Sequence, residues 1–246
     1  ERLVDIFLTD GRKYGKACEN ITITNCVMLS GHGGVVIGSE MSGGVKRVTI
    51  SNCVFDGTDA GIRLKASRGR GGVVEQIRVD NIVMRNIQRN AFIFDLFYDK
   101  TSKVEPVSER TPIFRNIHLS NITGREIKQI GYISGIEEMP VQNLSFNNIN
   151  MEAQTGFIVD TAQDIYFDNV EFSAEKGSPW QFSNSEKIIL NNVRTKYPVE
   201  GTPVITFDNV KKAYISNCMQ IEPVTTFFKA TNSEIKEGGT NLISEK

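Results

Sequence analysis

The sequence lacks the features that mark several common classes of protein. It contains one Trp, two His and four Cys in 246 residues, and its 28 basic and 29 acidic residues give a formal net charge of -1. Such a balance creates no overall field that would attract nucleic acid or an anionic membrane. No apolar run approaches the roughly 20 residues of a membrane span, and residues 1–10 show no signal peptide. We therefore expect neither a nucleic-acid nor a membrane partner.

The few cysteines follow a pattern that does not suggest pairing. Cys26, Cys53 and Cys218 each directly follow an asparagine, and the fourth is Cys18. Their spacing fits neither a disulfide framework nor a metal-binding motif. A small thiol repeated in one slot is typical of buried, unreactive cysteine. We expect free thiols and no metal site.

The sequence is rich in one repeat. Eight short runs alternate apolar and polar residues and end in Asn, as at 21–25, 48–52 and 77–81. A period of two indicates strands with one buried face. Successive asparagines are 27, 29, 40, 27, 21, 23 and 25 residues apart, and they are Asn25, Asn52, Asn81, Asn121, Asn148, Asn169, Asn192 and Asn217.

This repeat predicts an all-β protein, a right-handed, single-stranded parallel β-helix. A coil of 20 to 30 residues cannot bury its own interior, so it must stack on similar neighbours. Stacking would place the asparagines in a ladder at a corner, where Asn tolerates left-handed backbone. The alternative is an antiparallel sandwich, but its hairpins would show two-residue glycine turns.

We interpret residues 1–246 as a single β-helix domain. The long step from Asn81 to Asn121 contains a polar stretch, 99–111, which we expect to protrude as a loop. Residues 221–246 read as a carboxy-terminal cap and tail.

Two clusters depart from the repeat, and the first contains a histidine. His32 lies between glycines in Ser30-Gly31-His32-Gly33-Gly34. The glycines would let a ligand or a neighbouring backbone approach closely. The alternative role for His32 is a loop histidine that only donates to a carbonyl.

The second cluster is basic. Strand alternation directs Ile62 and Leu64 inward and places Arg63 and Lys65 side by side on the outer surface. Arg68 and Arg70 follow in a glycine-rich loop. Four cations within eight residues indicate an anionic partner such as a carboxylate, because Arg offers two-pronged hydrogen bonding and Lys a point charge. The alternative is a solvated edge that discourages aggregation.

Together these clusters resemble glycoside hydrolase family 28, the polygalacturonases and related pectin hydrolases. In that family a Gly-His-Gly and an Arg-x-Lys element lie on successive coils, matched here by Gly31-His32-Gly33 and Arg63-Leu64-Lys65. The longer agreements, Gly-His-Gly-Gly-Val-Val-Ile-Gly-Ser-Glu and Gly-Ile-Arg-Leu-Lys, are similar to the bacterial branch. The resemblance is strongest from residue 11 to residue 98.

The resemblance implies inverting hydrolysis of α-linked galacturonide bonds in pectin, without a metal or organic cofactor. In the family one aspartic acid protonates the leaving oxygen, and a pair of aspartates activates water from the opposite face. Carried over, His32 would orient or tune the acid, and Arg63 and Lys65 would bind a uronate carboxylate. A pectin-type polysaccharide or oligogalacturonide is the expected partner, and the parent protein would be secreted or periplasmic.

The chain departs from the family where the acids should be. The Asn-Thr-Asp and Asp-Asp elements normally precede Gly-His-Gly, but only Asp5 and Asp10 stand before Gly31. We therefore expect amino-terminal coils to be missing and this chain alone to be inactive or impaired. The acids remaining near the basic cluster are Glu40, Asp56, Asp59 and Asp95.

Three other interpretations stay open. The chain could be a β-helix module that binds anionic polysaccharide without turnover, or a structural β-helix of the trimeric tailspike kind. A lyase acting on uronate would require carboxylates that hold Ca²⁺, and the sequence shows no convincing cluster. A stack without its first coils would also expose core and strand edges, which predicts self-association.

Overall fold

The computed structural model describes residues 15–245, and in this range the chain forms strands and loops only. Residues 1–14, including Asp5 and Asp10, lie outside the described range. No helix in the described part is long and apolar enough to cross a membrane. The strands are β1 (Cys18–Thr24), β2 (Val27–Leu29), β3 (Val35–Ile37), β4 (Val45–Asp56), β5 (Ala60–Lys65), β6 (Val73–Asp95), β7 (Ile113–Ser134), β8 (Val141–Asp160), β9 (Ala162–Ser183), β10 (Glu186–Arg194), β11 (Ile205–Asp208), β12 (Lys211–Ser216), β13 (Met219–Val224), β14 (Phe228–Thr231), β15 (Ile235–Gly238) and β16 (Leu242–Glu245).

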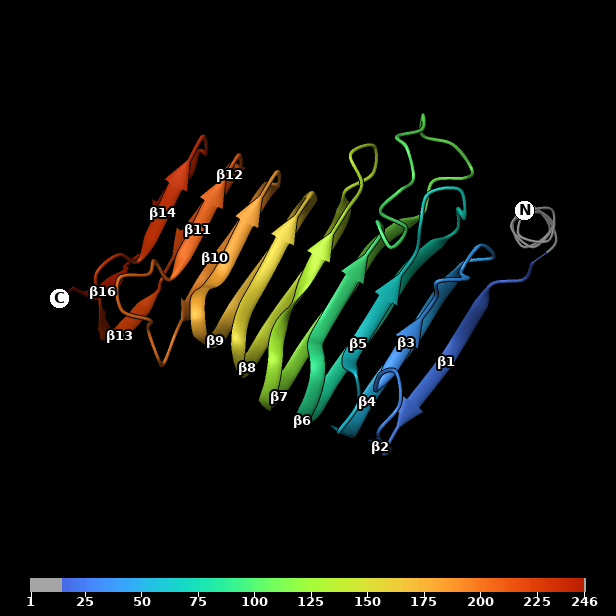
Figure 1. Ribbon diagram of the computed structural model, residues 1–246, viewed down its shortest axis with the longest axis horizontal. Coiled ribbons are helices and arrows are strands. Elements are labelled where there is room, and N and C mark those ends of the chain that lie inside the picture. Colours follow the sequence, from blue (N-terminus) through green and yellow to red (C-terminus); the bar gives the residue numbers. More distant parts are fainter. Residues whose placement is uncertain (1–14, 246) are drawn as a thin grey trace.

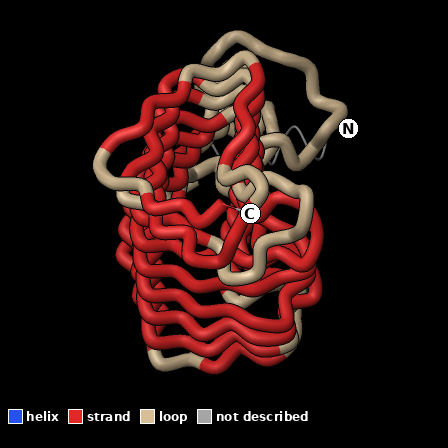
Figure 2. Tube along the Cα trace, turned by 90° about the vertical axis from the view of Figure 1, so that its left-hand side faces the viewer, coloured by secondary structure: helices blue, strands red, loops and turns tan. Residues whose placement is uncertain are grey.

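The strands wind into a parallel β-helix, as predicted (Figures 1 and 2). Every pairing between these strands is parallel, and the central order β1-β4-β6-β7-β8-β9-β10-β12-β15 steps from one coil to the next. The long strands bend round corners, so each coil has three faces. The first face carries the runs that end in Asn, the second carries the four or five residues after that Asn, and the third carries β3, β5, the carboxy-terminal ends of β6 to β9, β11 and β14.

The predicted asparagine corner is present. All eight repeat asparagines have left-handed backbone, with φ between 51 and 56°, a conformation that costs most other residues about 1–2 kcal/mol. Their side chains bond from coil to coil, for example Asn148 Nδ2 to Asn121 Oδ1 at 2.6 Å and Asn169 Nδ2 to Asn148 Oδ1 at 3.1 Å. The row is interrupted at Asn121 and at Asn217, whose amides donate to Asp80 and Asn191 instead.

A second left-handed corner lies five residues before the first, and the repeat did not reveal it. Its residues are chemically mixed, so no shared side chain marks the position: Asn20, Arg47, Gln76, Asn116, Asn143, Asp164, Lys187 and Lys212.

The interior is filled by like residues stacked on like, and in the carboxy-terminal half by aromatic rings. Phe146 and Phe167 stack with centroids 4.7 Å apart, and Phe172 stacks on Trp180 at 4.3 Å. These side chains are fully buried. Offset and edge-on aromatic contacts add to the gain from apolar burial.

The cysteines are free, as expected from their pattern. Cys53 and Cys218 are buried, and the thiols of Cys26, Cys53 and Cys218 each donate to the carbonyl two residues earlier. Burial raises the pKa of Cys218 to about 11, so this thiol is inert. Cys18, outside the repeat slot, is exposed.

Residues 96–112 join β6 to β7 without forming a strand, and they protrude at one side of the stack (Figure 1). We predicted a cap and tail for the segment 221–246. Its residues 221–245 complete the end of β13 and form β14, β15 and β16, which pair with β11, β12 and β13. The pattern was too weak to show this coil because most of its residues are exposed and polar.

Candidate functional site

His32 lies in the turn between β2 and β3, at the entrance to the third face. Gly31 has a φ of +93°, and a Cβ on Gly34 would lie 2.4 Å from the ring of Phe55. These glycines therefore let the turn bend tightly and pack on the next coil. The His32 side chain is 90% exposed, and its Nδ1 is 3.5 Å from Asp59 Oδ2.

Arg63 and Lys65 project from β5 onto the outer surface, as alternation predicted, while Ile62 and Leu64 are fully buried. Both cations lie over the ring of Tyr98, with Arg63 Cζ 5.9 Å and Lys65 Nζ 4.9 Å from its centroid. Neither forms an ion pair with a carboxylate among the described residues. The Nε of Arg63 is buried without a hydrogen-bond partner in the described part of the chain. A buried, unsatisfied donor is costly, so this guanidinium is suited to receive an anionic ligand.

Asp95 is paired in register with Lys65 on the next coil. Its carboxylate accepts from the backbone N–H of Phe97 at 2.9 Å and from the Tyr132 hydroxyl at 3.1 Å. Burial nevertheless raises its pKa, because desolvation outweighs these bonds. The pKa of Tyr132 is also raised, by burial and by the neighbouring Asp95.

A pocket of about 350 Å³ lies on the third face. Arg63, the carboxyls of Asp59 and Asp95 and the two tyrosines line it together with further basic groups, whereas His32 and Lys65 do not line it. The lining residues are Asp59, Ala60, Arg63, Arg89, Asn90, Ile93, Asp95, Tyr98, Lys100 and Tyr132.

Arg68 and Arg70 take a different position from the one expected. Arg68 is buried and holds Glu138 with two bonds, at 2.6 and 2.8 Å. Arg70 Nη1 is 2.6 Å from Glu40 Oε1. Neither lines the pocket. Both already have a carboxylate of the chain itself, so the structure does not join them to Arg63 and Lys65.

Of the four acids singled out from the sequence, two line the pocket and two do not. Asp59 and Asp95 line the pocket, whereas Glu40 is paired with Arg70 and Asp56 ends β4 away from the pocket. The described residues contain no group of three His, Cys, Asp or Glu side chains that could hold a metal ion.

Tyr98, Tyr132 and Arg89 are pocket residues that the sequence analysis missed. Tyr132 could have been found, because it follows Arg63 and Ile93 in register along the third face. Tyr98 belongs to an irregular loop, so no periodicity places its ring over Arg63.

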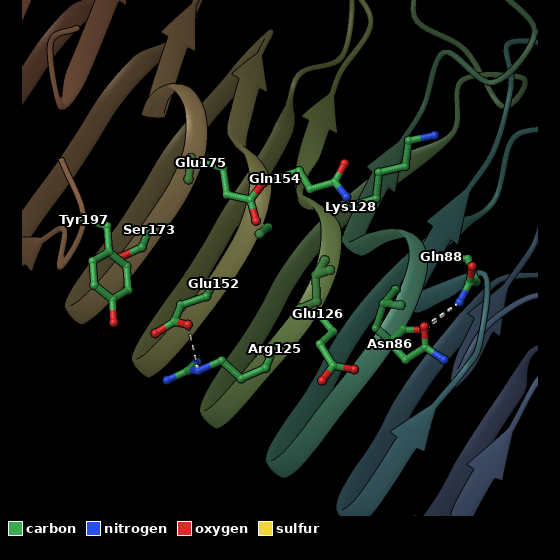
Figure 3. A pocket seen from close by; sticks show the side chains of 14 residues that line it. Asn86, Gln88, Arg125, Glu126, Lys128, Glu152, Gln154, Ser173, Glu175 and Tyr197 are labelled. Carbon is green, nitrogen blue, oxygen red and sulfur yellow. Dashed lines mark hydrogen bonds and ion pairs between the residues drawn. The ribbon is translucent and has the colours of Figure 1, made fainter. Parts of the chain in front are cut away.

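A larger cavity, about 870 Å³, lies along the corner between the second and third faces. Figure 3 shows Lys128, Gln154 and Glu175 on one rim and Arg125, Glu152 and Tyr197 on the other. Arg125 Nε is 3.3 Å from Glu152 Oε2. The residues predicted from the sequence do not line it, and its charges are of both signs.

Comparison with known proteins identifies relatives that are named as polygalacturonases. The chain is 25% identical over 207 residues to a probable polygalacturonase of Vitis vinifera, covering 83% of this chain and 41% of that protein. It is 27% identical to a polygalacturonase of Ralstonia nicotianae, with 77% and 36% covered. The chain thus spans less than half the length of these curated relatives.

A solved structure supports the fold. The crystal structure of a hyperthermoactive exopolygalacturonase from Thermotoga maritima matches with a TM-score of 0.60 and 29% identity, covering 65% of this chain and 36% of that one. This likeness agrees with the right-handed turn that parallel crossovers adopt. The family model for glycosyl hydrolases family 28 matches residues 9–174, so the chain belongs to that family.

Proposed function

We propose that the protein is a polygalacturonase-type glycoside hydrolase and that this chain binds a uronate carboxylate with Arg63 and Lys65. The observation that carries the proposal is the pair of cations on one aromatic ring, beside a pocket and without carboxylate partners among the described residues. Arg63 would hold the carboxylate through two N–H groups and Lys65 would add a point charge. The Tyr98 ring would contact the apolar face of the sugar.

The pocket also contains groups with the properties of an acid and a base. An inverting glycosidase needs two carboxyls about 6.5–9.5 Å apart, one of them protonated. The raised pKa of Asp95 suits an acid, and exposed Asp59 beside His32 suits a base or its support. These carboxyls stand outside the Asn-Thr-Asp and Asp-Asp elements of the family. That observation favours the second candidate, a module that binds pectin without turnover.

Calorimetry with a galacturonic acid trimer tests the binding step. We expect Arg63→Ala to weaken binding roughly 10- to 100-fold, because a charged hydrogen-bond partner is lost, and Lys65→Ala to weaken it less. The matched control is Arg78→Ala, since Arg78 is an exposed strand arginine on the first face. Equal losses in the Arg63 and Arg78 variants would contradict the proposal.

Release of reducing ends from polygalacturonate separates the two candidates. Turnover that Asp95→Asn abolishes would support hydrolysis within this pocket. Binding without turnover would favour the module, and loss of both signals would leave a structural β-helix.

Two further proposals concern the location of the parent protein and the self-association of this chain. A pectin-type substrate lies outside the cell, which favours a secreted or periplasmic parent protein. Ile21, Ile23 and Met28 in the first described coil pack on the core yet are only partly buried, which favours self-association of this chain. A stable monomer in light scattering would contradict that second proposal.

A further inference from the structure

The outer surface of the first face changes character along the stack. One row of outward side chains runs through successive coils in register: Thr22, Thr49, Arg78, His118, Ser145, Tyr166, Ile189, Tyr214 and Lys236. Its first part is polar and internally bonded, with Thr49 Oγ1 donating to Thr22 at 3.1 Å and His118 Nδ1 lying 2.6 Å from Ser145 Oγ. From β9 to β12 the row is apolar and aromatic.

Tyr166, Ile189 and Tyr214 form this aromatic row. These residues are 36, 38 and 40% exposed, and they come from β9, β10 and β12, which lie on adjacent coils (Figure 1). Adjacent strands are about 4.8 Å apart, so the backbones of the two tyrosines are separated by roughly 9–10 Å. That is about the length of two pyranose units in an extended chain. The intervening Ile189 keeps the surface between them apolar.

The row is bordered by hydrogen-bonding groups on one side. Asp168, Asn191 and Ser216 lie two residues further along the same strands and point outward. Asn191 donates to Asp168, and Ser216 Oγ donates to Asn191 Oδ1 at 3.1 Å. Burial and the neighbouring Asp168 raise the pKa of the Tyr166 hydroxyl. Such a strip can exchange hydrogen bonds with sugar hydroxyls beside a stacked ring.

The other side of the row carries charges that cancel. Lys187 Nζ is 3.3 Å from Asp164 Oδ1, and Lys212 Nζ is 3.5 Å from Glu186 Oε1. Lys236, which follows Tyr214 in the row, has its Nζ 3.8 Å from Glu234 Oε1. The border therefore offers no net positive charge, and Asp168 adds a negative one, so the row lacks the free cations that favour a polyuronate at Arg63.

We propose that the aromatic row binds a neutral polysaccharide chain, of the extended β-linked glucan kind, by stacking pyranose rings on Tyr166 and Tyr214. Aromatic rings present a π face to sugar C–H groups, and the spacing of two strands between the tyrosines fits every second sugar. A second protein is a poorer occupant, because three side chains that are about two-fifths exposed offer far less than the roughly 800 Å² per partner that a stable interface buries. The site is on a different face from the uronate pocket, so both ligands can bind at once.

Native gels containing hydroxyethylcellulose, an uncharged β-glucan, test the proposal on the whole chain. The wild type is expected to be retarded relative to a gel without polymer. Tyr166→Ala and Tyr214→Ala are each expected to weaken binding roughly 2- to 10-fold, and the double variant to migrate as in plain gel. Tyr166→Phe keeps the ring and should keep most of the retardation.

Matched variants separate binding from folding. Tyr197→Ala removes a tyrosine that is 53% exposed elsewhere, and it should leave the retardation unchanged. Thermal unfolding of each variant identifies any loss that comes from the sheet itself. Absence of retardation in the wild type, or an equal loss in Tyr197→Ala, would overturn the proposal, as would tyrosine variants that lose stability but keep full retardation.

Testing each variant with the ligand of the other site distinguishes this site from the uronate site of the proposed function. Arg63→Ala should leave the β-glucan retardation unchanged, and the double tyrosine variant should bind the galacturonic acid trimer like the wild type. Weaker trimer binding in the double tyrosine variant would show that the row belongs to the uronate site, and would overturn the assignment to a neutral chain.

Discussion

The coils around Phe167 and the coils around Arg63 share one strand pattern but differ in how their side chains are packed and hydrogen-bonded. In the first region each inward ring packs on rings above and below, and the corner amides bond to their counterparts on the next coil. In the second region Arg63 has an unsatisfied Nε and Asp95 is buried at the cost of a raised pKa. The corner amides are satisfied in the same way on successive coils, although the indole Nε1 of Trp180 is also buried without a hydrogen-bond partner among the described residues. What distinguishes the second region is that its charged groups, Arg63 and Asp95, line a pocket.

The aromatic stack should be the most sensitive part of the molecule. Phe167 contacts the rings of Phe146, Phe157 and Trp180, and its replacement by Ala leaves a cavity among them. We expect Phe167→Ala to lower the free energy of unfolding by about 3–5 kcal/mol. Urea unfolding measures this, and the outward neighbour Tyr166→Ala is the control, with an expected loss below about 1 kcal/mol. Similar losses in both variants would show that the interior is not tightly packed.

The buried ion pair between Arg68 and Glu138 should show the next largest effect. Arg68 and Glu138 have side chains only 6 and 9% exposed, so Glu138→Ala strands a buried guanidinium. We expect a loss of about 3 kcal/mol. Glu105→Ala breaks the exposed pair with Arg110 in the same part of the fold and should cost less than about 1 kcal/mol. Equal losses of stability in the two variants would show that the Arg68–Glu138 pair is exposed to solvent.

Substitutions in the asparagine ladder should separate the effect of left-handed backbone strain on stability from the effect of the lost amide hydrogen bonds. Asn148 has φ of 52° and bonds to Asn121 and Asn169. We expect Asn148→Ala to cost about 2–3 kcal/mol, through both lost bonds and left-handed strain. Asn148→Gly keeps the backbone freedom, so it should recover part of that loss in the same unfolding experiment. A glycine variant no better than alanine would mean that the amide bonds alone matter.

The contrast between the two regions also explains what could be predicted from the sequence. Strand alternation is a local property, so it correctly placed Arg63 and Lys65 outward and Ile62 and Leu64 inward. The left-handed corner was predictable because one residue type, Asn, fills it in every coil. The second corner was not, since Arg47 and Lys212 there share only their backbone conformation with Asn20.

Partners distant in the sequence were beyond prediction. Arg68 meets Glu138, which lies 70 residues away, and the loop that carries Tyr98 has no repeat to register it against β5. The number of cations from Arg63 to Arg70 therefore overestimated the positive charge available to a ligand, because two of the four are already paired with carboxylates of the chain.

The smallest expected effect is the contribution of Asp95 to the pH dependence of stability. It also gives the most direct comparison of the pocket with its surroundings. Its pKa is raised in the folded state by burial, so the folded chain holds this proton more readily than the unfolded chain. The stabilisation is fully present below the ordinary pKa of aspartate and is lost as pH rises through the folded pKa. Asp95→Asn does not titrate, so the wild type should gain stability relative to this variant as pH falls from about 7 to about 4.

Asp99 provides the control of opposite sign. Hydrogen bonds from the Thr101 hydroxyl and backbone lower its pKa, so its contribution is present above the ordinary pKa and disappears as pH falls through the folded value. Relative to Asp99→Asn, the wild type should therefore lose stability only below about pH 4, as pH falls toward about 2. Urea unfolding of the three proteins from about pH 7 to about pH 2 gives both differences. Parallel pH dependences in the two variants would show that Asp95 is as well solvated as Asp99, and the pocket would then lack the protonated carboxyl that a glycosidic acid requires.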